Sequence, residues 1–426
     1  MSVPKPLSYG SIKSIFQHIN PNLRIQVSER CPSLRTAEKS TPMALQYLDL
    51  DTGSYSMNSL TYQLQTTVEG EDALEVLGPY RREMFITDDI NRFGLTNYAE
   101  DDILEAGDIK IPGLDMESYR ARRELIEEET RERAEILAET QDREIVRDLV
   151  PNVQYGLRFS VWEKSTMIRK EEMEKEPKRI RHALSYLADK LFGGRIGLYV
   201  HCLKINDNTG VYRLPRDFRV RIRRLKIERN ASKLVNSPFN AIAPIIDKRS
   251  FPLKHICIDG YFEDVNVGNY VHPFIENAKM CTIAQERLED SDDSPPPMSM
   301  VDAMMATRCK IVALDCNAGE LTEAMVQNIM DSLLTASPPK KIHLRVQSMT
   351  PARVQAFHRM LGAMHGGLSK QIGRYWCNEF PTAIIFPVDS STKLLVYCMH
   401  NNKYDTWQLH FNVVTNERYI YMKMQF

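Results

Sequence analysis

Residues 6–40 read PLSYGSIKSIFQHINPNLRIQVSERCPSLRTAEKS, and this stretch predicts three short helices separated by proline. In the first helix, apolar side chains recur at the spacing of one helical face. They are Ile12, Ile15, Phe16 and Ile19. Pro21 and Pro32 each end one helix and can begin the next, because proline is tolerated at a first helical position. Helices this short bury little surface by themselves, so we expect them to pack on a partner or on a neighbouring domain.

Residues 43–114 are predicted to form a β-hairpin and an irregular connection. Between Met43 and Val68, apolar residues recur at the period of a strand. Asp51-Thr52-Gly53 interrupts this pattern as a turn signal, so the chain is expected to reverse there. From residue 69 the sequence is mixed and acidic and has no clear period, which predicts irregular structure.

Residues 115–150 are predicted to form a long charged helix. Glu, Arg, Ala and Leu dominate this segment, and opposite charges recur three and four residues apart. Its apolar positions are sparser than the about two in every seven residues that a coiled coil requires. We therefore expect a mostly solvated helical spacer that ends at Pro151.

Residues 151–426 alternate short apolar strands with helices, which predicts an α/β region within an α+β chain. The expected strands are 153–162, 198–205, 220–227, 253–258, 279–283, 310–314 and 341–346. The expected helices are 180–192, 321–334 and 351–364. From 198 onward the strands begin roughly 20 to 35 residues apart, which favours a largely parallel, irregular leucine-rich-repeat-like region. After Ala383, antiparallel strands are expected at 384–387, 393–398, 406–414 and 419–424.

These patterns predict four segments. They are a helical module at 4–42, a hairpin with its connection at 43–114, a helical spacer at 115–150, and an α/β region at 151–426. The acidic, proline-rich stretch EDSDDSPPPMSM at 289–300 is expected to be a disordered loop within the last segment. At 426 residues the chain is long enough for two or three domains.

The composition favours a globular protein in the cytoplasm and/or the nucleus. Apolar residues make up 43% of the chain, and the formal net charge of −1 disfavours a nucleic-acid partner. No apolar run of about 18 residues predicts a membrane span, and the N-terminus lacks the apolar core of a signal peptide. The 8 cysteines are scattered, without the C-x2-C spacing of a zinc site, which favours reduced, buried thiols.

The sequence lacks the usual catalytic motifs. A phosphate loop, a zinc-protease helix, a nucleophile elbow and a kinase motif set are all missing. His201-Cys202 and His255-x-Cys257 are the nearest approach to a Cys–His pair, but a catalytic pair is normally assembled from distant segments. We therefore expect a non-catalytic interaction protein without cofactor, metal or catalytic residue.

One strand carries a concentrated positive charge. Arg219, Arg221, Arg223 and Lys226 alternate with apolar residues, which predicts a strand with one basic face and a bulge at Arg223-Arg224. This face suits an acidic partner or a nucleic acid, and it equally suits a solvated sheet surface. The stretch 219–229 contains no aromatic residue on which bases could stack, which disfavours nucleic acid.

The order of residues in the N-terminal module resembles an F-box. The matching positions are Pro6-Leu7, Ile12, Ile15, Ile19, Pro21, Leu23-Arg24, Val27-Ser28, Cys31 and Leu34. Three further stretches, HALSYLADKLFGGR (182–195), LPRDFRVRIRRLKI (214–227) and DKRSFPLKHICI (247–258), extend the likeness over most of residues 4–285. Together they resemble a nematode family of uncharacterised proteins, the F-box C group.

This resemblance implies that residues 6–40 dock on the Skp-type adaptor of a cullin–RING (SCF-type) ubiquitin ligase. The residues implied in adaptor binding are Leu7, Ile12, Ile15, Ile19, Pro21, Leu23 and Val27. The C-terminal α/β region would then hold an unknown target protein, and the helix at 115–149 would set the distance between the two ends.

Two other functions are compatible with the sequence. The chain could be a scaffold protein whose N-terminal helices pack on the hairpin at 43–68, in which case the apolar stripe is internal core. It could also bind nucleic acid through the basic strand at 219–229. The sequence does not define the oligomeric state.

Overall fold

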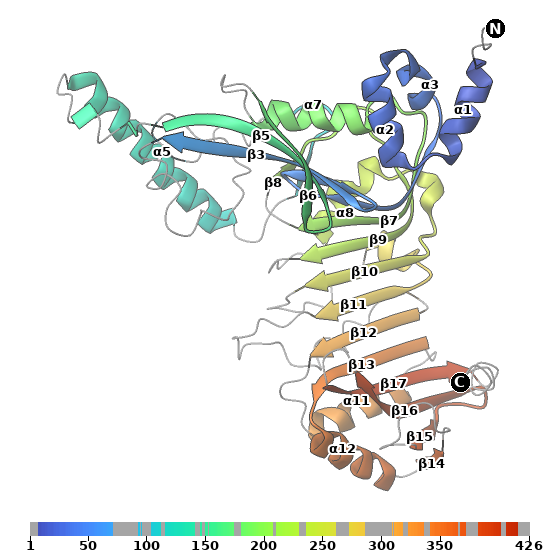
Figure 1. The fold of residues 1–426 in the computed structure, drawn as a ribbon. Helices are drawn as coiled ribbons and strands as arrows, with labels where there is room; N and C mark the ends of the chain where they lie inside the picture. The colour runs from blue at the N-terminus through green and yellow to red at the C-terminus, as the bar shows by residue number, and fades with distance from the viewer. Residues whose placement is uncertain are drawn as a thin grey trace. The chain divides into compact units, whose positions relative to one another are not determined.

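The structure of the chain is a computed structural model, drawn as a ribbon in Figure 1. It describes residues 7–70, 93, 95, 104–111, 116–140, 145–146, 150–151, 153–173, 180–207, 210–229, 236–260, 272–285, 309, 311–317, 323–335, 341–364, 367–371, 382–401 and 406–415. The predicted loop at 289–300, the predicted strand at 419–424 and most of the predicted connection at 69–114 lie outside these residues.

The fold is mixed α+β, and the chain forms two compact units. Unit 1 comprises Met1–Arg223 and Asn240–Ser250, and unit 2 comprises Arg224–Phe239 and Phe251–Phe426. This division differs from the predicted segments, because the α/β region predicted at 151–426 is shared between the two units. The reason lies in strand pairing: a strand that begins at Met43 pairs with one that begins at Leu198, which joins distant parts of the chain in unit 1.

Unit 1 begins with three short helices. They are α1 (Tyr9–His18), α2 (Pro21–Arg30) and α3 (Arg35–Lys39), with a single 3-10 turn at Pro32–Leu34 before α3. The Ser8 hydroxyl accepts a hydrogen bond from Ser11 N and caps α1, and the Asn20 side chain accepts from Asn22 N and caps α2. Pro21 and Pro32 occupy first-turn positions, as their fixed backbone angle favours.

The sheet of unit 1 follows these helices. Its strands are β1 (Met43–Leu50), β2 (Ser54–Met57), β3 (Leu60–Gly70), β5 (Val153–Glu163), β6 (Thr166–Met173) and β7 (Leu198–Asp207). They lie in the order β7-β1-β2-β3-β5-β6, and β1 pairs in parallel with β7 while the other neighbours are antiparallel. The predicted reversal at Asp51-Thr52-Gly53 is confirmed, because β1 and β2 pair antiparallel on either side of it, but the returning strand is divided into β2 and β3. The division occurs at Asn58, whose φ of 55° is not compatible with a continuing strand.

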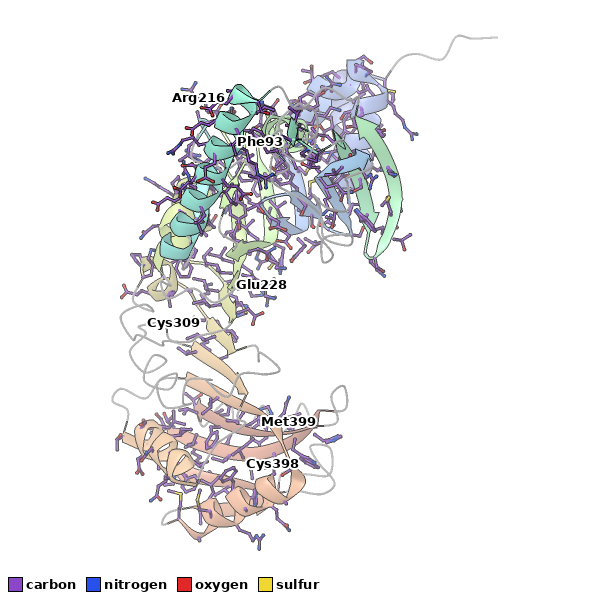
Figure 2. All side chains as sticks on the ribbon, turned by 90° about the vertical axis from the view of Figure 1, so that its left-hand side faces the viewer. Phe93, Arg216, Glu228, Cys309, Cys398 and Met399 are labelled. Carbon is purple, nitrogen blue, oxygen red and sulfur yellow. The ribbon has the colours of Figure 1, made fainter. Side chains whose placement is uncertain are left out.

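Helices α7 (Ile180–Phe192) and α5 (Met116–Glu139) complete unit 1, together with the short strands β4 (Ile109–Ile111) and β8 (Gly210–Tyr212). The bounds of α7 agree with the prediction, its apolar side chains such as Leu184, Leu187 and Leu191 are buried, and the helix contacts β3 (Figure 1). Helix α5 is mostly exposed over its described side chains, in agreement with the predicted solvated helix, and Ile126 and Leu137 are half-buried on one side. Arg133 Nη1 donates to the Phe93 carbonyl at 3.3 Å, and Phe93 lies next to α5 in Figure 2.

Unit 2 is built on parallel strands. They are β9 (Arg221–Arg229), β10 (His255–Gly260), β11 (Cys281–Gln285), β12 (Ile311–Asn317) and β13 (Lys341–Met349), of which β9 begins in unit 1. Each pairs in parallel with the next. Four further strands are antiparallel: β14 (Leu368–Gln371), β15 (Thr382–Pro387), β16 (Thr392–Asn401) and β17 (Thr406–Thr415). The sequence predicted the parallel run and the antiparallel end, but not β14.

Helices accompany the strands of unit 2. They are α8 (Asn236–Ile242), which crosses into unit 1, α9 (Pro273–Glu276), α11 (Glu323–Thr335) and α12 (Pro351–Ala363). Helices α11 and α12 lie side by side, and α12 contacts β15 and β17 (Figure 1). Consecutive residues of a strand face opposite sides, as Cys398 and Met399 do on β16 (Figure 2). Cys398 is buried on one face of β16. On the other face, Met399 packs on an apolar cluster of Ala383, Ile385, Leu395, Tyr397 and Val414, so β16 has apolar contacts on both faces.

Candidate protein-interaction surface

The inner side of the helical module is fixed to the sheet of unit 1. Phe16 of α1 and Ile25 of α2 are buried. Asn22 of α2 donates from Nδ2 to the Met57 carbonyl at 3.0 Å, and its Oδ1 accepts from the Tyr62 hydroxyl at 3.2 Å. These bonds join α2 to β2 and β3, so the module packs on the strands that follow it in the chain.

A buried cluster of charges extends this attachment. Glu38 Oε1 lies 3.2 Å from Arg24 Nε and 2.6 Å from Arg195 Nη1. The exposed fractions of the Arg24, Glu38 and Arg195 side chains are 2%, 1% and 3%. Arg24 also donates to the carbonyls of Pro42, Glu38 and Thr41, at 2.8 to 2.9 Å. Every nitrogen of the Arg24 guanidinium therefore has an acceptor.

This cluster determines how the module is oriented within unit 1. Arg195 follows α7 and donates from Nε to the Leu191 carbonyl at 2.6 Å, so Glu38 is held by the end of α7. Burial lowers the pKa of Arg24, and the nearby Glu38 carboxylate partly offsets this effect. Removing one partner of such a buried network leaves an uncompensated charge, which is strongly destabilising. Sequence reasoning missed this cluster, because no local pattern connects Glu38 with Arg195.

The outer side of the module carries apolar side chains in contact with solvent. Leu7, Ile15 and Leu23 have exposed fractions of 62%, 45% and 49%. The other residues of the predicted adaptor-binding set, Ile12, Ile19, Pro21 and Val27, are half-buried. We call these seven residues the module face. Phe16, which shares the predicted stripe, turns inward and belongs to the core instead.

Tyr9 adds to the exposed apolar surface of α1 and was not predicted. Its exposed fraction is 51%, its hydroxyl lies 2.8 Å from Ser40 Oγ, and Lys13 Nζ lies 4.9 Å from its ring centre. A single exposed apolar residue is ordinary, but several on consecutive helices mark a protein-interaction site. The module face is therefore the candidate docking surface.

The basic strand has the predicted two faces. Val220, Ile222, Leu225 and Ile227 are buried. Arg219, Arg221 and Arg223 are exposed. Arg224 is exposed as well, so the alternation of burial shifts by one residue at the predicted bulge. The pairing of β9 with β10 nevertheless runs without a break from Arg224 to Arg229.

Lys226 differs from the three arginines with which it was grouped. It lies in unit 2 and is half-buried, and its Nζ lies 2.7 Å from Glu228 Oε1 and 2.8 Å from Asp259 Oδ2. Burial lowers the pKa of Lys226, but its hydrogen bonds to Asp259 and Glu228 outweigh this and raise the pKa overall. The predicted patch for an acidic partner thus reduces to Arg219, Arg221 and Arg223, because two carboxylates already neutralise Lys226.

The structure places an aromatic ring beside these arginines. The Arg221 guanidinium carbon lies 5.9 Å from the centre of the Tyr199 ring, a cation–π geometry. Tyr199 lies on β7 and is exposed. Nearby, Asp247 and Arg249 form an ion pair with contacts of 2.6 to 3.1 Å, and hydrogen bonds from Arg249 lower the pKa of Asp247 to about 2. No local pattern predicts this neighbour, since Tyr199 is far from β9 along the chain.

Of the residues in the two Cys–His pairs considered from sequence, His255 of β10 contacts a side chain of the neighbouring strand β11. His255 Nε2 lies 2.8 Å from Thr282 Oγ1, and burial lowers the pKa of His255, with a further contribution from Arg224. Burial raises the pKa of the Cys281 thiol, which keeps it protonated. Among the residues that the structure describes, no group of three or more His, Cys, Asp or Glu side chains could hold a metal ion.

Comparison with known proteins gives one match. A family model described as "Domain of unknown function (DUF3557)" matches residues 179–316. This stretch begins at α7, includes Arg195, Tyr199 and the basic strand, and ends within β12. No curated protein matches the chain, and no solved structure matches it. No helix in the described ranges has the length and apolar character needed to span a membrane.

Proposed function

We propose that this chain is a non-catalytic substrate-recognition subunit of a cullin–RING ubiquitin ligase, acting in the cytoplasm or the nucleus. In this role the module face docks on a Skp-type adaptor, and no residue of the chain performs chemistry. The observation that carries the proposal is the exposure of Ile15 on α1, Leu23 on α2 and Leu7 just before α1, on a module whose opposite side is anchored in unit 1. The ordered F-box-like motifs of residues 4–54 and beyond support it.

The packing of the module suits such a role. Exposed leucine and isoleucine side chains on consecutive helices can enter an apolar groove, as in helix-in-groove recognition. The buried charge cluster holds α2 and α3 in one orientation before a partner arrives, which reduces the entropy lost on binding. A preorganised apolar face is what an adaptor-binding module requires.

We further propose that the parallel strands β9–β13 form a leucine-rich-repeat-like region that holds the target protein. Their starts, from Arg221 to Lys341, are separated by roughly 30 residues, the interval of strand-plus-helix repeats. Inward positions such as Leu225, Ile256 and Ile283 are buried at each step, which is how a repeat forms a continuous core.

The adaptor proposal is tested by recovering the purified adaptor with wild-type chain and with an Ile15→Asp, Leu23→Asp double variant. Two charges in a desolvated apolar contact should weaken binding at least about a hundredfold. Leu125→Asp is the matched control, because Leu125 is also an exposed leucine but lies on α5, outside the module face; this variant should bind like wild type. Circular dichroism should show the double variant folded. Wild-type chain that does not bind the adaptor, or a folded double variant that binds fully, would refute the proposal.

The scaffold function makes a different prediction for the same variants. If the module only stabilises the sheet of unit 1, the double variant should lose helix content or thermal stability. The contacts of Asn22 with Met57 and Tyr62 favour a contribution to stability from the inner side of the module. Ile25→Asp, at a buried position of α2, should unfold the module and so provides the reference circular dichroism signal for the unfolded module.

A further inference from the structure

We propose that the exposed face formed by Arg219, Arg221, Arg223 and Tyr199 binds an acidic polypeptide segment in extended form. This inference deepens the proposed function, on which it rests for its biological role, because it names the chemistry of a target segment that residues 219–223, at the start of the proposed target-binding region, would recognise. All four residues belong to unit 1.

The spacing of the arginines fits an extended peptide. Alternate residues of a strand lie roughly 6.7 Å apart on one face, and alternate side chains of an extended peptide repeat at the same distance. Arg221 and Arg223 are alternate residues of β9, and Arg219 precedes β9, next to Val220, which forms a bridge with Ile246; all three arginines are exposed, with Val220 and Ile222 buried between them. A peptide with an acidic residue at every second position could therefore place one carboxylate near each guanidinium.

The arginines are available for a partner. Arg219 Nη1 donates to the Phe218 carbonyl, and Arg221 lies over the Tyr199 ring, and neither of these two contacts supplies a negative charge. Lys226, in contrast, already has two carboxylate partners. The ring of Tyr199 restricts the motion of Arg221, so less side-chain entropy is lost when an anion binds.

A carboxylate on this side of the unit is already stabilised in its charged form. The pKa of Asp247 is lowered to about 2, chiefly by hydrogen bonds from Arg249 and to a smaller extent by the charge of Arg221. Asp247 also neutralises the nearby Arg249, so the positive charge that a ligand would meet comes from Arg219, Arg221 and Arg223.

An acidic peptide fits this face better than a nucleic-acid strand. A strand of nucleic acid binds best on aromatic rings with free faces for its bases, but the Tyr199 ring beside these arginines is covered on one face by Arg221. A long polyanion would also contact the surface beyond these three arginines. The formal net charge of the chain is −1, so the chain has no overall excess of positive charge to attract it. A short acidic segment needs only the three guanidinium groups of Arg219, Arg221 and Arg223.

The test measures binding of fluorescent probes to the full-length chain at about 50 mM salt by anisotropy. The probes are a short synthetic peptide with glutamate at alternate positions, the same peptide with lysine there, and a single-stranded oligonucleotide. We expect the glutamate peptide to bind best. Its affinity should fall about tenfold or more when Arg219, Arg221 and Arg223 are changed to Gln, because charge complementarity is lost.

A matched control removes the same charge elsewhere in unit 1, by changing the exposed Arg30, Arg35 and Lys164 to Gln. This control should bind the glutamate peptide like wild type. Tyr199→Ala should weaken binding a few-fold, and Tyr199→Phe should restore it, because the ring supports Arg221. All variants are first compared with wild type by circular dichroism.

Three outcomes would overturn the proposal. They are no binding of the glutamate peptide, equal weakening by the two triple variants, and tighter binding of the oligonucleotide, which would indicate a nucleic-acid surface. The assay contains no adaptor, so its failure leaves adaptor docking untouched. Failure of adaptor docking, in turn, leaves a positive peptide result in place.

Discussion

At the scale of single residues, Glu38 is the shared partner of two buried arginines in unit 1. One of its carboxylate oxygens, Oε1, serves both Arg24 and Arg195. The other, Oε2, is buried and has no hydrogen-bond partner among the described residues. Two buried cations thus depend on one anion, and removal of that anion leaves both cations without a counter-charge.

We predict that Glu38→Gln lowers the free energy of unfolding of unit 1 by about 3 to 5 kcal/mol, because the variant leaves two buried guanidinium groups without a counter-charge. Urea unfolding followed by circular dichroism measures the loss. Glu132→Gln, at an exposed position of α5, provides the same chemical change without burial and should stay within about 0.5 kcal/mol of wild type. Equal stability of the two variants would contradict the prediction.

His272 gives unit 2 a dependence on pH. Its Nδ1 accepts a hydrogen bond from Phe274 N at 3.1 Å, which requires the unprotonated ring. Burial lowers the pKa of His272, and Glu276 opposes this in part. Since the folded pKa lies below the unfolded value of about 6.5, the unfolded state binds more protons there and stability falls as pH decreases through about 6.5.

We therefore predict weaker protection of 273–285 from hydrogen exchange at pH 5.5 than at pH 7.5, after correction for intrinsic rates. His272→Asn keeps a side-chain acceptor that does not titrate, so the pH dependence should become shallower. Some dependence should remain, because burial also lowers the pKa of His255. An unchanged slope in His272→Asn would show that this ring is not responsible.

At the scale of elements, the sequence predicted what local period and proline can specify. The bounds of α7 agree with the prediction, and β10 to β13 lie within a few residues of their predicted positions. Strand β6 was missed because TMIRKEEM has no alternating pattern, and its pairing with β5 decides its structure. Strands β4 and β8 have 3 residues each, too few to show a period.

The candidate site was predictable only in part, because contacts between distant segments decide which of its side chains are buried. Helical spacing brings Ile12, Ile15, Phe16 and Ile19 to one side of α1, but it does not say which of them meets the sheet. Packing on β2 and β3 buries Phe16 and leaves Ile15 exposed. Charge contacts between distant segments, such as Glu38 with Arg195 or Arg221 with Tyr199, have no signal in local sequence.

Asn58 is the residue that divides the predicted hairpin, and it makes a testable case. Its side-chain Oδ1 accepts from Gln46 N at 2.9 Å and from Tyr47 N at 3.2 Å, while its φ is 55°. Asn58→Val should cost about 2 to 4 kcal/mol, because it loses both bonds and strains the backbone. Asn58→Gly keeps the backbone and should cost less, which thermal melts can compare. Equal melting temperatures for the two variants would exclude a contribution from φ.

At the scale of the whole molecule, the two units should unfold separately. Each has its own buried core, which is the condition for independent cooperative transitions. Glu38→Gln should therefore shift the urea transition of exchange-protected peptides from β1 to β3 but leave those from β15 to β17 unchanged. Hydrogen exchange with mass spectrometry resolves the two sets. Parallel shifts in both would mean that the chain unfolds as one.

The parallel pairing of β1 with β7 has a consequence for biosynthesis. Met43 leaves the ribosome well before its partner Leu198, and at translation rates of about 5 to 20 residues per second the interval is roughly 8 to 30 s. During that interval Leu45 and Leu48 of the nascent chain are on a strand with one unpaired edge. We expect a chaperone that binds nascent chains to raise the yield of soluble protein, and the gain should be measurable by co-expression.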